Sequence, residues 1–176
     1  MAHLTSHHIL RRGTWLKSDS RVVLGYDARF LRRKRLVAED GTSFLVDLKE
    51  TQSLDHGDAF QLSDGRLIVV SAAVEPVLRI TGDLPRLAWH IGNRHTPCQI
   101  AVDHLVIRRD HVLEKMLIGL GATLTVAEAP FQPEGGAYGH GRTMGHDHGG
   151  HDHGGHDHGA EFGLHHHGDG VLHRHG

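Results

Sequence analysis

The chain changes character near residue 135, and that change limits how much of it can form a folded core. After Pro133 the hydrophobic patterning disappears, and glycine and polar residues dominate the next stretch. A five-residue repeat follows, in which His-Asp-His units alternate with Gly-Gly pairs. Such a segment has little apolar surface to bury, so we expect it to be disordered without metal. Folding is thus confined to about 135 residues, enough for one core or two small domains.

Histidine is concentrated in this C-terminal segment. Of the 20 histidines in 176 residues, eight precede residue 140 and twelve follow from His140 onward. Neutral imidazole is the commonest protein ligand for zinc, copper, iron and nickel. A purification tag would be an uninterrupted histidine run, without the interleaved Asp and Gly seen here. The composition predicts that the tail binds divalent transition metals. The candidate ligands are His146, His148, His151, His153, His156, His158, His165, His166, His167, His173 and His175.

Metal selectivity in such a tail is expected to be poor. The chain has one cysteine, Cys98, so neither a disulfide framework nor a cysteine-type zinc site can form within it. Without thiolates the tail should bind nickel, copper and zinc, and copper should have the highest raw affinity. Protons compete with metal for imidazole, so binding should weaken as the pH falls through about 6.5.

The stretch from Arg21 to about Ala73 has a β-like pattern. Val22, Leu24 and Tyr26 lie at alternate positions, and no window has good helical periodicity. Asp-Gly pairs at 40–41 and 64–65 stand between short apolar runs and predict two hairpins, and His56-Gly57-Asp58 predicts another turn. This region therefore reads as a small all-β domain.

From about Val74 the pattern becomes mixed. Glu75–Thr81 reads as a strand, and Asp83 and Asp110 are candidate N-caps for two helices with apolar stripes. Two short strands, 98–102 and 105–108, separate the helices, and 123–127 reads as a last strand. The order β-α-β-β-α-β is that of a ferredoxin-like domain, in which two helices pack on one face of an antiparallel sheet.

We therefore predict an α+β chain in three parts. Residues 1–73 form a β domain, and residues 74–135 form a ferredoxin-like domain. Residues 136–176 form the disordered metal-binding tail. The N-terminus has no signal-peptide pattern and no segment approaches transmembrane length, so we expect a cytoplasmic protein that does not contact a membrane.

The charge balance does not indicate a nucleic-acid partner. Lys and Arg number 19 against 21 Asp and Glu. The one basic cluster comprises Arg29 and residues 32–35, Arg-Arg-Lys-Arg. We favour a solvated strand face with a turn over a nucleic-acid patch, and a docking surface for an acidic protein partner stays open.

Two histidines of the folded part need separate consideration. His90 and His95 are five residues apart, about 140° around a continuous helix, which is not the spacing of a helical metal pair. Gly92-Asn93 is expected to end the helix in the left-handed conformation, which leaves His95 in the following loop. One loop histidine cannot hold a metal alone, although a two-fold axis would bring two copies together. Composition alone favours an ordinary loop histidine.

The stretch from Trp89 to Gln99, WHIGNRHTPCQ, changes that preference. It resembles the hallmark motif of the urease accessory protein UreE family, nickel metallochaperones with an aromatic residue followed by H-(L/I)-G-N-R-H-x-P-x-Q. Residues 108–121, RRDHVLEKMLIGLG, resemble the start of that family's second helix, and residues 130–141, PFQPEGGAYGHG, resemble its link into a His-rich tail. The N-terminal half is similar more loosely, through its β pattern and Asp-Gly turns.

The resemblance implies that the β domain, residues 1–73, binds a partner or peptide. It implies that the ferredoxin-like domain, residues 74–135, binds metal and forms a homodimer. It implies nickel binding by His95, once per protomer at the dimer interface, with tail histidines completing the coordination. His90 matches the first motif histidine, and we interpret it as structural, orienting the loop rather than binding the ion. Arg94 is expected to position the loop.

In one place the chain departs from the family pattern. Some members carry His-x-His where this chain has Arg109-Asp110-His111, so His111 is more simply a surface residue of the helix start. His104 is interpreted as a turn residue, and whether either histidine binds metal stays open. Cys98 alternates with Ile100 and Val102, which favours core packing over metal ligation.

The predicted function is a metallochaperone that delivers Ni²⁺ for assembly of the urease active site, with Zn²⁺ or Cu²⁺ able to compete. The tail would capture nickel, and about 30 flexible residues reach roughly 30 Å. Transfer would be to the accessory GTPase and the urease apoprotein complex. No acid–base or nucleophile constellation is found, so we predict no enzyme activity.

Two alternatives remain. A general buffer or storage protein for Ni, Zn or Cu would depend only on the tail. A metallohydrolase would need at least three ligands near an open position and a base.

Overall fold

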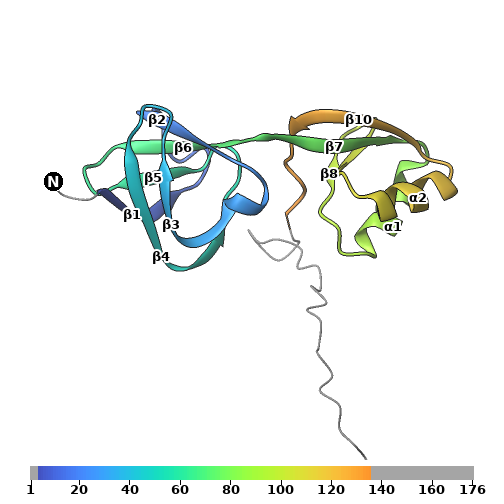
Figure 1. Cartoon of the computed structure of the whole chain (residues 1–176), viewed down its shortest axis with the longest axis horizontal. Coiled ribbons are helices and arrows are strands. Elements are labelled where there is room, and N and C mark those ends of the chain that lie inside the picture. The colour runs from blue at the N-terminus through green and yellow to red at the C-terminus, as the bar shows by residue number, and fades with distance from the viewer. Residues whose placement is uncertain (1–3, 136–176) are drawn as a thin grey trace, which may run out of the picture. The chain divides into compact units, whose positions relative to one another are not determined.

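A computed structural model describes residues 4–135. The tail histidines expected to bind metal, and the disorder predicted for that segment, lie outside the described residues. Two sheets form within the described range, one in the N-terminal part and one in the C-terminal part (Figure 1). No helix in this range is long and apolar enough to span a membrane.

The first sheet has six strands in the spatial order β2-β6-β5-β1-β4-β3, which confirms the predicted strand-rich N-terminal domain. A 3-10 turn, η1, precedes the third strand. The elements in chain order are β1 (Leu4–Leu10), β2 (Ser20–Leu24), η1 (Asp27–Arg29), β3 (Phe30–Val37), β4 (Ser43–Ser53), β5 (Ala59–Leu62) and β6 (Leu67–Ala72).

Both predicted Asp-Gly hairpins are present. Gly41 joins β3 to β4 with φ +83, and Gly65 joins β5 to β6 with φ +90, in the left-handed region that glycine adopts without strain. Asp40 and Asp64 each accept a hydrogen bond from the backbone N–H two residues further on, at 2.9 and 3.1 Å. These bonds hold the pKa of both carboxyl groups below its usual range.

The sequence does not predict β1. This strand lies inside the sheet, parallel to β4 and antiparallel to β5. Of its residues only Ser6 is buried, so the stretch lacks the alternation by which strands are recognised. Its position depends on partners about forty or more residues further along the chain, which local pattern does not reveal.

The core of this domain is built from alternating strand positions. Val22 and Leu24 are buried in it, as their alternation predicts, and Phe44 and Phe60 meet with ring centroids 5.6 Å apart. The remaining buried members are Leu31, Leu36, Ala38, Val46, Leu48, Leu54, Leu62, Ile68 and Val70.

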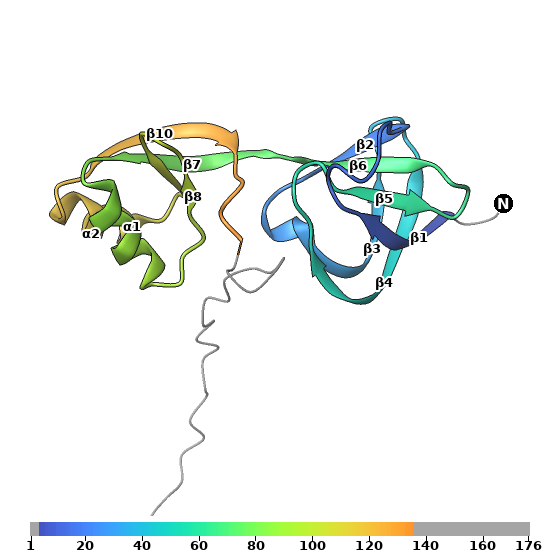
Figure 2. The ribbon, with the colours of Figure 1, turned by 180° about the vertical axis from the view of Figure 1, so that it is seen from behind.

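The second sheet has four strands in the order β10-β7-β9-β8, each antiparallel to its neighbours. With its two helices this is the predicted ferredoxin-like order, and both helices lie on the same face of the sheet (Figures 1 and 2). The elements are β7 (Val74–Thr81), α1 (Leu84–Gly92), β8 (Gln99–Ile100), β9 (Leu105–Arg108), α2 (His111–Gly119) and β10 (Thr123–Pro130).

Both helices begin at the predicted caps. The Asp83 carboxylate accepts from the backbone N–H of Arg86, and the Asp110 carboxylate accepts from the first turn of α2. Both predicted apolar stripes face the sheet. The buried core consists of Leu78, Ile80, Leu87, Ile91, Leu105, Ile107, Leu113 and Leu117, with Leu84, Ala88, Cys98, Met116 and Leu120 partly buried against it.

Arg29 differs from the basic cluster in which the sequence places it. It is buried, and its guanidinium donates to the carbonyl oxygen of Phe131 and lies 5.5 Å from the centre of the Tyr26 ring. Tyr26 and Phe131 belong to a third small cluster with Val77 and Val106. The interpretation of Arg29 as part of a solvated face is therefore wrong, because a carbonyl 102 positions away accepts its hydrogen bond.

Candidate metal centre

The candidate metal residue, His95, lies in the turn that follows α1. Its backbone has φ 54, and it is the one non-glycine residue with positive φ among residues 4–135. The sequence assigns the left-handed position to Gly92-Asn93, and that assignment is wrong. Asn93 has φ −64, and the left-handed residue is the histidine itself.

Two backbone hydrogen bonds define this turn. The N–H of His95 donates to the carbonyl of Gly92 at 2.9 Å, and the N–H of Thr96 donates to the carbonyl of Ile91 at 3.4 Å. This is the Schellman pattern of a helix C-terminus, in which the left-handed position is usually glycine. A residue with a Cβ costs about 1–2 kcal/mol there. The turn therefore carries strain at an exposed imidazole.

The neighbouring motif residues surround this turn. Arg94 is exposed, and its Nε lies 2.9 Å from the Sδ of Met116 on α2, so its side chain links the turn to the second helix. His90 lies in the last turn of α1, half-buried, with its ring edge-on to Trp89 at 4.9 Å between centroids. Trp89 itself is 64% exposed.

Residues 4–135 contain no group of three or more His, Cys, Asp or Glu side chains able to hold a metal ion. Cys98, three residues past His95, is half-buried against the core of the domain. Burial is the main cause that raises the pKa of its thiol to about 11. A thiol of this kind is a poor metal ligand at neutral pH, because the thiolate is the ligating form. Core packing explains Cys98, although Ile100 and Val102 in its alternation are exposed.

The two remaining histidines of this domain lie apart from the turn in sequence. His104 lies between β8 and β9, with Nδ1 2.6 Å from the Asp103 carboxylate, which also pairs with Arg79 at 2.9 Å. The hydrogen bond with His104 holds the pKa of Asp103 below its usual range. His111 is the first residue of α2 and is exposed. Both positions are those the sequence predicts.

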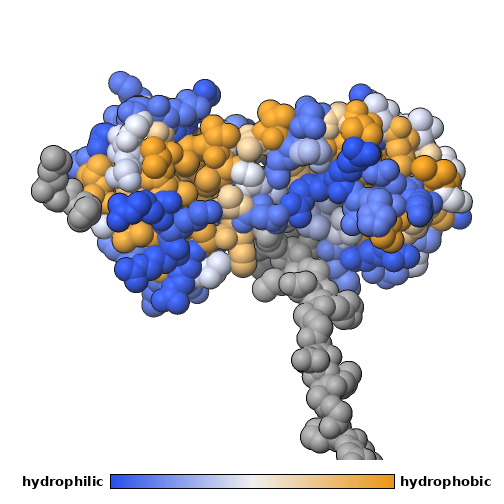
Figure 3. Space-filling view, in the orientation of Figure 1, coloured by the Kyte–Doolittle hydropathy of each residue, from blue (hydrophilic) through white to orange (hydrophobic). Residues whose placement is uncertain are grey.

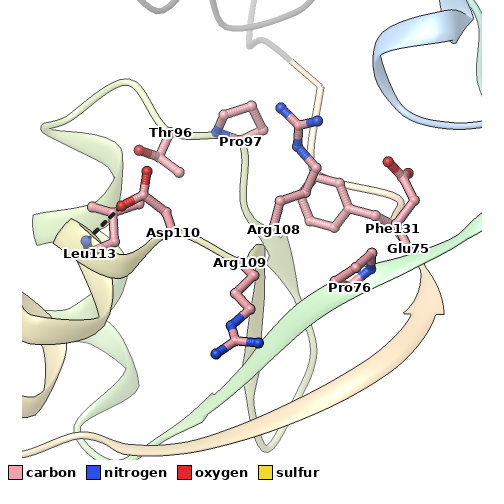
Figure 4. Close-up of a pocket in the computed structure, with 9 residues that line it drawn as sticks. All are labelled: Glu75, Pro76, Thr96, Pro97, Arg108, Arg109, Asp110, Leu113 and Phe131. Atoms are coloured by element: carbon pink, nitrogen blue, oxygen red, sulfur yellow. Dashed lines mark hydrogen bonds between the residues drawn. The ribbon is translucent and has the colours of Figure 1, made fainter.

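A pocket of about 430 Å³ borders the loop that follows His95 (Figure 4). Thr96, Pro97 and Asp110 lie on one side of it, and Glu75 and Phe131 lie on the other. The Asp110 carboxylate caps α2 by accepting hydrogen bonds from the backbone N–H groups of Val112 and Leu113. The other lining residues are Pro76, Arg108, Arg109 and Leu113, so no imidazole lines this pocket.

The sequence comparisons cover both domains. Residues 4–73 match the family model of the UreE urease accessory protein N-terminal domain, and residues 75–176 match that of the C-terminal domain.

Individual relatives agree with these matches. A urease accessory protein UreE of Cereibacter sphaeroides is 64% identical over 145 residues, 82% of this chain and 80% of the relative. One of Rhodobacter capsulatus is 62% identical over 141 residues, 80% of this chain and 90% of the relative. One of Ruegeria pomeroyi is 63% identical over 141 residues, 80% of this chain and 95% of the relative.

Proposed function

Because the chain belongs to the UreE family of urease accessory proteins, which act in urease maturation and are not enzymes, we propose that it delivers Ni²⁺ to the urease active site. The tail collects the ion, and His95 presents it for transfer. The receivers are the accessory GTPase and the urease apoprotein complex. The protein acts in the cytoplasm, where its single thiol, Cys98, stays reduced.

The observation that carries this proposal is the conformation of His95. Glycine adopts the left-handed backbone at the end of α1 without strain, yet a residue whose side chain can bind metal stands there. Strain of this kind is concentrated at functional sites, where the surrounding structure holds it. The turn leaves the His95 side chain exposed beyond the helix end, which supports its proposed role.

The proposal includes a homodimer with the two His95 residues near its axis. One imidazole is too few for a stable nickel site, and a two-fold axis supplies a second copy of the same group. Trp89 supports a contact in this region, because a large aromatic side chain left 64% exposed is the type enriched in interfaces. Tail histidines then complete a coordination shell that is open enough to release the ion.

Nickel titration by calorimetry tests the assignment. Full-length protein and a chain ending at residue 135 are compared, each with native His95 and with His95→Ala. We expect the shortened chain to bind one ion per dimer, and His95→Ala to abolish that binding. In the full-length chain the same substitution should remove one site and leave tail binding in place.

His111→Ala is the matched control, because His111 is also an exposed histidine next to a helix end of this domain. It should leave the stoichiometry unchanged. If the shortened chain binds no nickel tightly, the tail alone holds the metal, and the buffer or storage alternative replaces the chaperone. If His95→Ala binds as the native chain does, the ligand assignment is wrong.

A further inference from the structure

The strand β3 forms an edge of the six-stranded sheet and carries four consecutive basic residues. Within the described range it pairs with β4 on one side, and just past its end the backbone N–H of Glu39 donates to the carbonyl oxygen of Arg21 on β2 at 2.9 Å. Arg32, Arg33, Lys34 and Arg35 are all exposed, in a chain whose formal net charge is −2. The positive charge therefore lies along the edge of the sheet, where backbone N–H and C=O groups of β3 face away from β4.

These charges are largely uncompensated. Arg33 approaches the Asp47 carboxylate at 3.8 Å, and both side chains are well exposed, so the attraction is screened by solvent. Arg32, Lys34 and Arg35 make no ion pair with any residue between 4 and 135. An anionic partner could therefore bind Arg32, Lys34 and Arg35 without first displacing a carboxylate of this domain.

The register places the basic side chains on both sides of the edge. Lys34 pairs with Val46, whose side chain is buried, so it lies on the core-facing side. Arg33 and Arg35 pair with Asp47 and Leu45 and lie on the opposite side. A strand laid beside β3 would therefore meet a positive charge at each successive position, whichever way its side chains point.

Charge on an edge strand also has a purely protective explanation. Lysine on an edge, and charged groups directed inward, discourage edge-to-edge aggregation. That explanation accounts for Lys34 but requires only one or two charges. Here a run of four is bracketed by partly exposed apolar side chains, Phe30 at 37% and Val37 at 60%. Figure 3 shows hydrophobic surface beside hydrophilic surface over this domain.

We propose that the β3 edge binds an extended acidic segment of a partner protein, which adds to the sheet as a further strand. This inference rests on the partner-binding role expected of the strand-rich domain. Backbone hydrogen bonds supply part of the affinity, and carboxylates opposite residues 33–35 supply the selectivity. Apolar residues at the ends of the segment contact Phe30 and Val37.

The partner segment is defined by its pattern. Since basic residues occupy successive positions of β3, the matching carboxylates are consecutive rather than alternating. The minimal motif is three adjacent Asp or Glu residues opposite residues 33–35, with apolar β-branched residues at the positions opposite Phe30 and Val37 and without proline. A nucleic acid fits less well, because it cannot use the backbone edge and finds no aromatic residue for stacking among residues 31–36.

Fluorescence anisotropy with the full-length protein tests the proposal, at pH 8 with a metal chelator so that the tail imidazoles are uncharged and metal-free. The probe is a labelled peptide with Glu-Asp-Glu opposite residues 33–35 and valines at the positions opposite Phe30 and Val37. Lys34→Glu combined with Arg35→Glu leaves the contact of Arg33 with Asp47 intact. We expect this pair to weaken binding about tenfold or more. The matched control, Lys17→Glu with Lys115→Glu, changes net charge equally at exposed positions and should stay within about twofold.

Two further probes separate strand addition from charge attraction. The same peptide methylated on alternate backbone nitrogens keeps every carboxylate but cannot pair, and we expect it to bind at least about fivefold more weakly. Equal affinity for both peptides, or for native protein and the Lys34→Glu/Arg35→Glu variant, would overturn the proposal. So would tighter binding of a single-stranded oligonucleotide of equal charge. Nickel titration of the native protein keeps the two proposals separate, because an intact His95 site in a native protein that does not bind the peptide overturns this inference alone.

Discussion

The helices α1 and α2 end in the same way, yet different residues stand at the critical position. In α2 the N–H of Gly121 donates to Ile118 and the N–H of Ala122 to Leu117, which matches the bonds of His95 and Thr96 after α1. Gly121 has φ +87 and His95 has φ 54. Both helices have nine residues and pack on one sheet.

The difference indicates what each turn is selected to do. At the end of α2 the backbone geometry is the only requirement, and glycine meets it without strain. At the end of α1 the same geometry is made with a histidine, which costs free energy and leaves an exposed imidazole at the turn. Under the proposed function, the comparison separates a structural helix end from a metal-binding one within a single domain.

The largest expected effect comes from making the two helix ends alike. His95→Gly retains the backbone geometry and removes the imidazole, so the nickel site of the dimer should be lost. Loss of residues that merely support a ligand lowers metal affinity by about 10–100-fold, and loss of the ligand itself should exceed that. Calorimetric titration of the chain ending at residue 135 measures the change. Retention of one ion per dimer would show that the histidine at the turn has another purpose.

The reverse exchange should lower stability without creating function. Gly121→His places a Cβ at φ +87, and it should destabilise the protein by about 1–2 kcal/mol. Nothing lies within 4 Å of an added Cβ at this position, so the cost comes from the backbone and not from a clash. Urea unfolding measures the free energy, and nickel stoichiometry should not rise. An unchanged free energy would mean that the left-handed position tolerates histidine at no cost.

The same reasoning predicts a smaller gain at the other helix. His95→Gly relieves the strain of the left-handed residue, but glycine loses more chain entropy on folding. The net result should be a stabilisation of about 0.5–1 kcal/mol in the absence of metal. His95→Ala is the control, because alanine retains the strained Cβ and should show no such gain. Metal-free urea unfolding of both variants compares them directly.

The sequence predicts features that depend on neighbours along the chain. The caps Asp83 and Asp110, the turns at Gly41 and Gly65, and the strand and helix order of the second domain all follow from local patterns. Each depends on one or two residues whose preferences are intrinsic. The motif around His95 could be recognised, whereas its left-handed backbone could not, because Gly92-Asn93 offered residues better suited to that conformation.

Features that depend on distant partners were predicted poorly. β1 has no alternation of its own, and its place is decided by pairing with β4 and β5. Arg29 is buried because it reaches the carbonyl of Phe131. Ile100 continues an apolar alternation, yet it is exposed because β8 has two residues and lies at the edge of its sheet. Periodicity shows which residues share a side of a strand, but not whether anything covers that side.

The smallest expected effect concerns Cys98, which follows the functional turn and could compete with His95 for the role of ligand. Burial raises the pKa of its thiol from the ordinary value near 9.0 to about 11, so the folded protein favours the neutral thiol. The resulting stabilisation is complete below pH 9.0 and is lost as the pH rises toward 11. Cys98→Ala should therefore leave nickel stoichiometry unchanged and flatten the fall in stability between these pH values.

Alkylation by iodoacetamide at pH 8 gives an independent reading of the same thiol. The native protein should react far more slowly than the urea-unfolded chain, since the thiolate is the reactive form and the folded thiol is both protonated and half-buried. Nickel should not change the native rate if His95 is the ligand. Protection of the thiol by nickel would place the sulfur in the metal site. The ends of α1 and α2 would then differ by two metal ligands, Cys98 as well as His95.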